Sequence, residues 1–381
     1  MIYLDNAATT LKKPKGVLDA YLAAYQTCTS VGRGGYESSM NAAEIVYAAR
    51  EKAAELFGAS APEQVVFTSN ATHALNVAIK GVAKRGNCVI SGYEHNSVVR
   101  PINAYDGLEC RIASGKLFCP EMIVRSFERL IDKDTVFAVC THMSNVFGYI
   151  LPVERIDEIC YKKGIPLIID ASQSAGSIPI KLSRLRSCVC ICMPGHKGLY
   201  GPQGTGILVC REGEKLKTVI EGGTGSVSKD ITQPDFMPDR LECGTHNVPG
   251  IAGLSAGLSY ISERGERSVM RKERRLMQEM IKNLRKMNGI KVFASNDVLQ
   301  QGGVLSFVSD TMSPELIANS LNDEKIAVRS GFHCSPIAHE NVGTTEGTVR
   351  VSVSDFTEEN EVFFFLDKLS GILSARHKFL K

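Results

Sequence analysis

A lysine and a histidine stand side by side where an apolar run ends. The run is CICMP at residues 190–194, and GHKGLYGPQGTG follows it at 195–206. A lysine amine at the end of a buried strand can bond covalently to an aldehyde, whereas a lysine in a surface turn has no such task. The glycines allow the backbone to turn tightly beneath a ligand. Lys197 is therefore either a solvated turn residue or a nucleophile, and the rest of the chain decides between these interpretations.

Polar side chains also follow the other apolar runs in the first two-thirds of the chain. Runs at 64–68, 88–91, 135–141 and 166–170 are rich in Val and Ile and alternate with helical patterns such as 71–83 and 152–163. This alternation predicts an α/β fold with buried, mostly parallel strands covered by helices. Ligands bind such sheets at the carboxyl ends of the strands. We therefore expect the polar residues found there to converge on one crevice: Ser69, Asn70, Ala71 and Thr72; Glu94, His95 and Asn96; His142, Ser144 and Asn145; Asp170, Ser172 and Gln173; His196 and Lys197.

Each of these residues also has an ordinary structural explanation. Thr72 and Asp170 suit helix caps, Asn145 suits a turn, and His95 suits a core. Their convergence favours a site, because an anion site at a helix start, an imidazole, a carboxylate and a lysine can together hold a phosphorylated aromatic cation. Pyridoxal 5'-phosphate (PLP) is such a cofactor: a lysine forms its Schiff base, and a carboxylate pairs with its pyridine nitrogen. Asp170 precedes Lys197 by 27 residues (197 − 170), which leaves room for a helix and a strand between them.

The C-terminal third shows a different pattern. We expect a long helix over 255–287, strands at 303–308, 325–329 and 348–352, a helix at 314–322 and a final helix from residue 358. This mixture predicts a compact α+β domain. At 381 residues, the chain is long enough for one large domain and a smaller partner domain.

Composition argues against two classes of partner. The 44 basic and 41 acidic residues nearly balance, giving a net charge of +3, so no nucleic-acid partner is expected. The most basic stretch, 264–285, interleaves Glu and Met at helical spacing and reads as a solvated helix face. No apolar run approaches the roughly 20 residues of a membrane span, so no membrane partner is expected either. The N-terminal MIYLDNAATT lacks the features of an export signal, and we expect a cytoplasmic location.

The twelve cysteines are spread along the chain rather than arranged as a disulfide framework. Cys188, Cys190 and Cys192 alternate and would share one face of a strand. No CxxC pair or histidine pair accompanies them, so we expect small buried side chains there and no metal site.

Eight motifs together resemble a known family. The chain resembles the class V aminotransferase branch of the fold-type I PLP-dependent enzymes, and within it the cysteine desulfurases of the NifS/SufS kind. The resemblance implies a mostly parallel central sheet flanked by helices and a smaller α+β C-terminal domain. It implies an N-terminal segment at 1–15 that packs with the small domain, a large PLP-binding domain at 16–250 and a small domain at 251–381. The motifs are YLDNAATT at 3–10, TSNATHALN at 68–76, EHNS at 94–97, SNVFG at 144–148, DASQSAG at 170–176, GHKGLYGPQGTG at 195–206, ECGTHN at 242–247 and RSGFHC at 329–334.

The same resemblance implies roles around the cofactor. Lys197 is similar to the Schiff-base lysine, Asp170 to the carboxylate on the pyridine nitrogen and Gln173 to the residue that contacts the phenolic oxygen. His95 is similar to the imidazole that stacks on the ring and moves protons. The implied phosphate contacts are Ala71, through its backbone, together with Thr72, His196 and, from the other subunit of a homodimer, Thr245.

Other matched residues are implied to bind the substrate, L-cysteine. Asn6, Asn145 and Arg350 match residues near the substrate, and Asn145 lies near the cofactor as well. Arg350 would clamp the α-carboxylate, a task that suits the planar fork of arginine. One departure from the family concerns the phosphate site: many desulfurases have SGHK where this chain has PGHK, and Pro194 offers neither a hydroxyl nor an N–H. One phosphate bond is therefore lost or supplied elsewhere.

Cys334 is the expected nucleophile. It lies in a basic, turn-rich loop with Arg329 and His333, where a thiolate is stabilised. The implied reaction converts L-cysteine to L-alanine and leaves the sulfur as a persulfide on Cys334, from which a sulfur-acceptor protein takes it. A short loop from Arg329 to Pro336 would keep the thiol near the cofactor.

Three alternatives stay open. A selenocysteine lyase, which yields selenide and alanine from L-selenocysteine, would share every residue named above. Another class V aminotransferase or lyase would share Lys197 and Asp170 but has no need of RSGFHC. A catalytically idle scaffold of the same fold would not need to keep the lysine, the aspartate and the histidine together.

Overall fold

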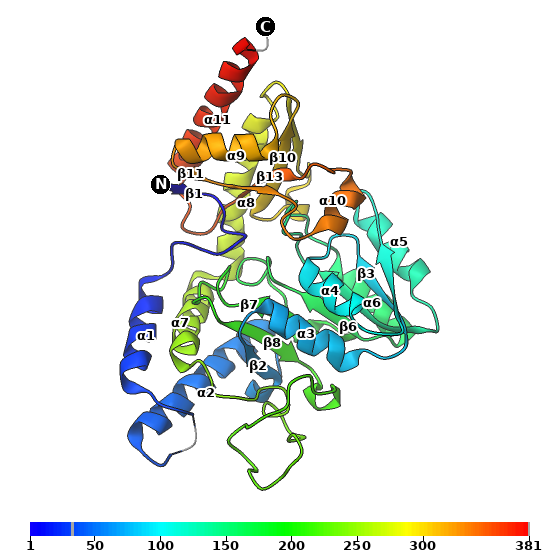
Figure 1. Cartoon of the computed structure of the whole chain (residues 1–381), viewed down its shortest axis with the longest axis vertical. Helices are drawn as coiled ribbons and strands as arrows, with labels where there is room; N and C mark the ends of the chain where they lie inside the picture. The colour runs from blue at the N-terminus through cyan, green and yellow to red at the C-terminus, as the bar shows by residue number, and fades with distance from the viewer. Residues whose placement is uncertain (32–33, 380–381) are drawn as a thin grey trace.

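The computed structural model of the chain describes residues 1–31 and 34–379. Two β-sheets lie one above the other in Figure 1, the larger in the lower half of the view and the smaller in the upper half. The chain starts beside the small sheet and then crosses to the helices around the large one. Among the described residues, no helix is both long enough and apolar enough to cross a membrane.

The large sheet has seven strands in the order β2-β8-β7-β6-β5-β3-β4. Every neighbouring pair from β7 to β4 is parallel, and only β8 runs against its neighbours. The predicted mostly parallel α/β sheet is therefore confirmed. The strands are β2 (Val65–Thr68), β3 (Gly86–Ser91), β4 (Leu108–Ala113), β5 (Thr135–Thr141), β6 (Leu167–Asp170), β7 (Cys188–Pro194) and β8 (Gly206–Cys210).

Helices cover both faces of this sheet. Side chains that alternate along a strand point to opposite faces, so Val65 and Phe67 join one hydrophobic core and Val66 joins the other. Cys188, Cys190 and Cys192 are fully buried in β7, as expected. The prediction that all three share one face is wrong, because the pairing of β6 with β7 shifts register after Cys188, which joins one core while Cys190 and Cys192 join the other. The helices of this half are α1 (Lys15–Thr27), α2 (Glu37–Phe57), α3 (Ala71–Val82), α4 (Asn96–Asn103), α5 (Pro120–Leu130), α6 (Val153–Lys163) and α7 (Val248–Arg264).

The small sheet has four strands in the order β12-β13-β10-β9, all antiparallel to their neighbours. A separate hydrophobic core lies between this sheet and its helices. The N-terminal β1 (Ile2–Tyr3) pairs with β11 (Ile326–Ala327) beside it. The elements are β9 (Ile290–Phe293), β10 (Val304–Ser309), β12 (Arg329–Gly331), β13 (Thr348–Ser352), α8 (Glu266–Leu284), α9 (Pro314–Asp323), α10 (Pro336–Val342) and α11 (Glu359–Phe379). The domain boundaries at residues 15 and 250 stay a prediction.

Two predicted elements are wrong in their extent. The long helix expected over 255–287 is two helices, because Gly265 has a φ of 79° between α7 and α8 and lets the chain change direction. The strand expected at 325–329 is also divided. Its first part pairs with β1, and its second part begins β12, which pairs with β13.

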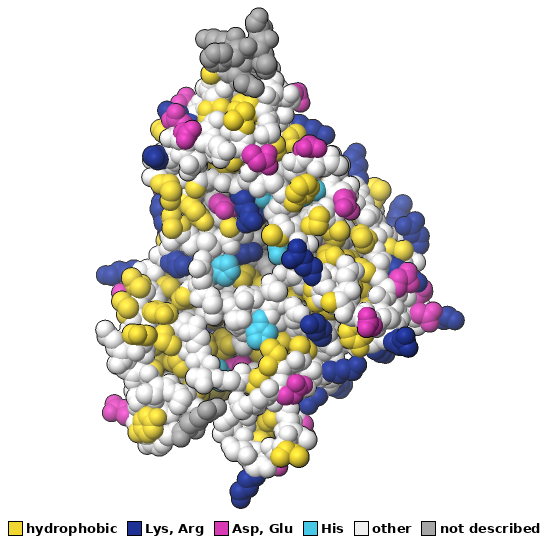
Figure 2. Space-filling model, in the orientation of Figure 1, with side chains coloured by type: hydrophobic (Ala, Val, Ile, Leu, Met, Phe, Trp, Pro, Cys, Tyr) yellow, Lys and Arg dark blue, Asp and Glu magenta, His cyan; other side chains and the backbone are white. Residues whose placement is uncertain are grey.

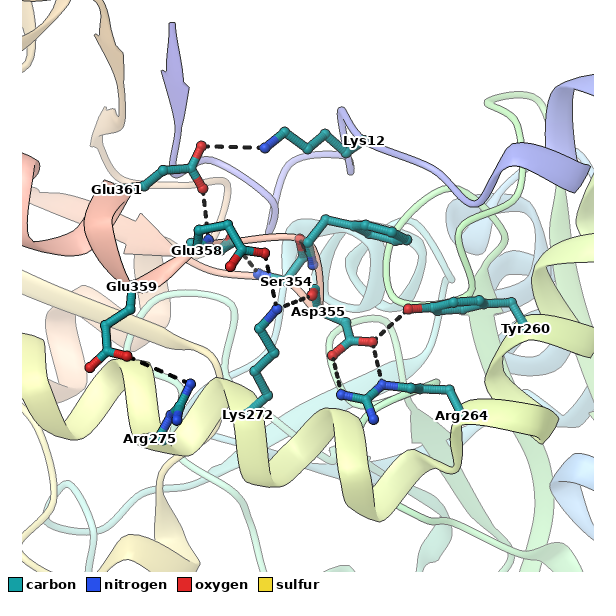
Figure 3. Close-up of polar contacts among 12 residues, drawn as sticks. Lys12, Tyr260, Arg264, Lys272, Arg275, Ser354, Asp355, Glu358, Glu359 and Glu361 are labelled. Atoms are coloured by element: carbon teal, nitrogen blue, oxygen red, sulfur yellow. Dashed lines mark hydrogen bonds and ion pairs between the residues drawn. The ribbon is translucent and has the colours of Figure 1, made fainter.

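A polar network ties the segment after β13 to the helices of both sheets (Figure 3). The Asp355 carboxylate accepts hydrogen bonds from Tyr260 Oη at 2.6 Å and from Arg264 Nε at 2.8 Å, both on α7. Lys272 Nζ on α8 donates to the Asp355 carbonyl at 2.6 Å. The backbone N–H of Asp355 donates to the hydroxyl of buried Tyr200, three residues after Lys197, at 3.0 Å. Asp355 thus links the small sheet to the lysine loop of the large one.

Replacing Asp355 by alanine should lower the free energy of unfolding by about 2–4 kcal/mol, because Arg264 and Tyr260 lose a buried charged acceptor. Burial alone would raise the pKa of Asp355, but the hydrogen bonds from Arg264 and Tyr260 hold it below its usual value. The stabilisation of the fold by ionised Asp355 is therefore present above about pH 4, and it is lost as the pH falls through the pKa that Asp355 has in the folded protein. Urea denaturation followed by circular dichroism at pH 7 and pH 3 measures both effects.

Arg275→Ala is the matched control. Arg275 and Glu359 form a separate exposed pair 3.8 Å apart near this network (Figure 3), and such pairs contribute little. If Arg275→Ala and Asp355→Ala destabilised the protein equally, the linking role of Asp355 would be wrong.

Candidate active site

A cavity of about 210 Å³ lies at the carboxyl ends of the parallel strands, between the two sheets. Figure 2 shows histidine and basic side chains gathered near the middle of the corresponding face. Larger hollows exist, such as one of about 690 Å³ among α1, α2 and α7, but it is lined mostly by alanines and other small residues. Its chemistry, rather than its size, distinguishes the smaller cavity.

Ten of the predicted site residues line this one cavity. They come from both halves of the chain, so the predicted convergence at the strand ends is confirmed in part; Ser69, Glu94, Asn96, His142 and Ser144 were expected there and do not line the cavity. The ten are Ala71, Thr72, His95, Asn145, Asp170, Gln173, His196, Lys197, Cys334 and Arg350.

Two of the residues that were predicted to bind substrate or cofactor also lie elsewhere. Asn6 is buried and donates from Nδ2 to the Ser352 carbonyl at 3.0 Å, so its amide anchors the N-terminal segment to β13. Thr245 is exposed in the segment between β8 and α7 and does not line the cavity of its own chain. The roles predicted for both remain predictions.

Sequence reasoning also missed several residues of the lining. Ala7, Ala8, Thr141, Met143 and Arg329 line it without having been expected, as does Ser97. The place of Ser97 at the cavity could have been predicted from the sequence, because it is a hydroxyl residue at the start of the helix that follows His95. The place of the alanines could not, because only the folded N-terminal segment brings them to the cavity.

Asp170 ends β6 and faces the lysine across the cavity. In the sheet it stands opposite Thr141 on one side and Cys192 on the other. Its Oδ1 accepts from the backbone N–H of Ser172 at 2.9 Å and from the Ser172 hydroxyl. Burial raises the pKa of Asp170, although the bonds from Ser172 and the charge of Lys197 oppose the rise. The carboxylate is thus held in place with its second oxygen left for a ligand.

Lys197 is a partly accessible amine in a desolvated setting. Burial lowers its pKa to about 8, helped by the positive charges of Arg350 and Arg329 and opposed by Asp170 and Asp5. At pH 7 about a tenth of such amines is neutral, against roughly one in three thousand at the ordinary pKa of 10.5. A neutral amine is the form that attacks a carbonyl.

Two glycines allow the lysine loop to press against the segment after Asp170. A Cβ on Gly176 would lie 2.2 Å from the Gly198 carbonyl oxygen, and a Cβ on Gly198 would lie 2.3 Å from the Ala175 carbonyl oxygen. Gly176 also has a φ of 89°. The glycine that follows Lys197 therefore serves close backbone approach. This contact holds the loop that carries Lys197 against the segment that follows Asp170.

His95 caps α4 and is neutral. Its Nδ1 accepts from the backbone N–H of Ser97 at 3.0 Å, so the ring proton is on Nε2. Burial lowers its pKa to about 4, and the charges of Lys197 and Arg329 contribute. The ring is therefore a flat, uncharged surface at physiological pH.

Cys334 lies on a short, strained loop at the cavity. Only residues 332–335 separate β12 from α10, and both His333 and Cys334 have positive φ, 51° and 59°. Asn145 holds this loop: its Nδ2 donates to the His333 carbonyl and its Oδ1 accepts from the Ser335 hydroxyl, both at 2.7 Å. The Cys334 carbonyl accepts from the Asn96 N–H at 2.8 Å. The thiol itself is exposed, and its backbone is pinned on both sides.

Arg350 is a deeply buried charge of the site, with 2% of its side chain exposed. Its Nη2 donates to Asp5 Oδ1 at 2.6 Å and its Nη1 to the Asn145 carbonyl at 3.1 Å. Its Nε has no protein partner. A buried guanidinium with unused donor capacity at a cavity suits a carboxylate ligand.

Comparison of the chain with known protein families and structures agrees with this geometry. Residues 2–365 match the family model described as aminotransferase class-V. The chain belongs to this family.

The similar proteins described below are all named cysteine desulfurases. The chain is 31% identical to the "Probable cysteine desulfurase" of Methanothermobacter thermautotrophicus, over 97% of the chain and 94% of that protein. It is 30% identical to a namesake from Mycolicibacterium paratuberculosis, of which it spans only 54%. An apo structure of cysteine desulfurase from Thermococcus onnurineus superposes with a TM-score of 0.91 at 30% identity, covering 98% of this chain and 95% of that one.

The lowered pKa of Lys197 predicts how its reaction with an aldehyde depends on pH. With PLP added as the aldehyde probe, the rate should rise with pH and level off above about 8, because the amine is protonated below that value and neutral above it. Stopped-flow absorbance from pH 6 to 10 measures this profile, with free Nα-acetyl-lysine as the reference.

Asp170→Asn should move the midpoint to lower pH, since the carboxylate raises the pKa of Lys197. A midpoint near 10.5 in the unaltered protein would show that the amine is not desolvated as the structure indicates.

Proposed function

We propose that this protein is a PLP-dependent cysteine desulfurase that converts L-cysteine to L-alanine and moves the sulfur first to Cys334. One observation carries the proposal: a single cavity holds Lys197 facing Asp170 and also Cys334 and Arg350. The first pair suits a covalently bound pyridine aldehyde, and the second suits sulfur transfer from an α-amino acid. The family membership and the names of the relatives support the same conclusion.

The lining fits PLP group by group. The Lys197 amine suits the aldehyde, and the buried Asp170 carboxylate suits a protonated pyridine nitrogen. The neutral ring of His95 suits a stacking surface, and the starts of α3 and α4 suit a phosphate. When bound, PLP would supply an electron sink that weakens bonds at the substrate α-carbon and β-carbon.

Substrate orientation falls to Arg350. Its free Nε and its Nη groups would bind the α-carboxylate of L-cysteine, and desolvation would strengthen that pair. Asp5 already occupies Nη2, so the guanidinium is held in one orientation before the substrate arrives. A fixed clamp of this kind orients the amino acid so that its sulfur reaches the loop of Cys334.

Proton transfer is assigned to Lys197. With a pKa of about 8, Lys197 can take the proton from the substrate α-carbon and return one to the carbon that becomes the alanine methyl group. His95 is neutral above about pH 4, so its Nε2 N–H donates a hydrogen bond near the ring, and the side chain takes up a further proton only below that pH.

Sulfur transfer needs no outside oxidant. The Cys334 thiolate attacks the substrate sulfur, an S–S bond forms, and the bond between the substrate β-carbon and its sulfur breaks. The electron pair of that bond stays with the carbon, which takes up a proton and becomes the methyl group of L-alanine. Cys334 is left as a persulfide, and the thiol of an acceptor takes its outer sulfur in the next step.

We further propose a homodimer in which Thr245 serves the partner's phosphate site, since Thr245 is exposed and lies outside its own cavity. The short loop of Cys334 favours an acceptor protein that approaches the cavity closely.

The cysteines are all unpaired in the structure, including Cys190 and Cys210 with their sulfurs 3.6 Å apart, which supports a reducing, cytoplasmic location. The names of the relatives favour cysteine over selenocysteine as the substrate.

Cys334→Ala should abolish the protein persulfide and at least about 90% of sulfide release while leaving PLP absorbance intact, because the nucleophile is lost and the cofactor lining is kept. Alanine and sulfide are measured after adding L-cysteine, with persulfide labelling in parallel and L-selenocysteine as a second substrate.

Cys243→Ala is the matched control, a partly exposed cysteine outside the cavity. Sulfur transfer at the unaltered rate in Cys334→Ala would overturn the assignment. Turnover of selenocysteine alone by the unaltered protein would favour the lyase.

A further inference from the structure

The phosphate side of the cavity lacks a donor where one is expected. Pro194 ends β7 and lines the cavity, but it carries neither a hydroxyl nor a backbone N–H. A phosphate group needs several donors around its oxygens once water is excluded. Some other group of this chain must therefore fill the place.

Two helices begin at this side of the cavity, and each brings a hydroxyl. Thr72 is the second residue of α3, and Ser97 is the second residue of α4. Their hydroxyl oxygens lie 2.7 Å apart, although the residues are 25 positions apart in the chain. Both line the cavity with Pro194 and Lys197. The positive ends of both helices and both hydroxyls thus meet at one point.

The Ser97 hydroxyl is not needed to cap α4. The cap is formed by the Ser97 backbone N–H, which donates to His95 Nδ1 at 3.0 Å. The hydroxyl lies 2.9 Å from the same nitrogen and 2.7 Å from the Thr72 hydroxyl. A hydroxyl can rotate its proton from one acceptor to another, so it can turn toward an anion without loss of the helix start.

We propose that Ser97 is a phosphate ligand of the cofactor and supplies the hydrogen bond that Pro194 cannot. The inference rests on the proposed function, since it assigns a ligand to the PLP of that site. It also gives Ser97 a second effect: the residue that binds the phosphate is the one whose N–H fixes the ring of His95.

Titration of the apo-protein with PLP and with pyridoxal, which lacks the phosphate, tests the proposal. Ser97→Ala should weaken PLP binding about tenfold, the usual loss for one hydrogen bond to a charged group, and leave pyridoxal binding unchanged. Unchanged pyridoxal binding also shows that the variant is folded. Ser97→Thr keeps the hydroxyl and should bind PLP like the unaltered protein.

Two further variants sharpen the test. Pro194→Ser in the Ser97→Ala background restores a hydroxyl at the other position and should recover most of the lost affinity. Ser38→Ala is the matched control, because Ser38 is likewise the second residue of a helix, α2, and pairs with a threonine hydroxyl, that of Thr29, at 3.3 Å. It should not change PLP binding.

The failures can be told apart. PLP binding by Ser97→Ala as tight as in the unaltered protein, or an equal loss for PLP and pyridoxal, overturns the role of Ser97 alone. If the double variant Ser97→Ala with Pro194→Ser does not regain PLP affinity, then the Ser97 hydroxyl does not replace a hydroxyl at position 194. If the unaltered apo-protein binds neither PLP nor pyridoxal, the proposed function fails, and the role of Ser97 fails with it.

Discussion

The parallel hydrogen bonding of β5, β6 and β7 is the constraint on which the site depends. It sets Thr141, Asp170 and Cys192 in line across the sheet, so the loops that follow these strands leave from one edge. Asparagine, carboxylate and lysine therefore reach the same cavity although their positions span more than fifty residues of sequence. A register slip of one residue would turn Asp170 to the opposite face and remove the carboxylate from the lysine.

The second sheet brings Arg350 and the loop of Cys334 to the cavity, and polar contacts fix its position. Asn145, from the large sheet, holds the loop of Cys334 through both its amide atoms and meets Arg350 through its carbonyl. Tyr200 reaches from the lysine loop to the backbone after β13, which Asp355 ties to α7. Residues of the two sheets are thus held at one cavity by contacts that are mostly buried.

Burial also determines the charge states in the cavity. The same desolvation that lowers the pKa of Lys197 and His95 raises that of Asp170, so the amine and the imidazole move toward their neutral forms. Arg350 stays charged at its buried position because Asp5 compensates it. The Thermococcus onnurineus structure shares this fold, and Pro194 and Ser97 both line the cavity of this chain.

The sequence by itself determined the strand pattern and the placement of Lys197 and Asp170 at strand ends and, through the resemblance, led to the prediction that Cys334 is the nucleophile. These rest on local signals, since apolar alternation and motif spacing lie within short stretches. The break at Gly265 was missed because helical residues flank it on both sides. The tertiary structure alone decided that Ser97 meets Thr72 and that Asp5 pairs with Arg350, 345 positions away. Such contacts depend on how distant elements pack, and no local pattern encodes that packing.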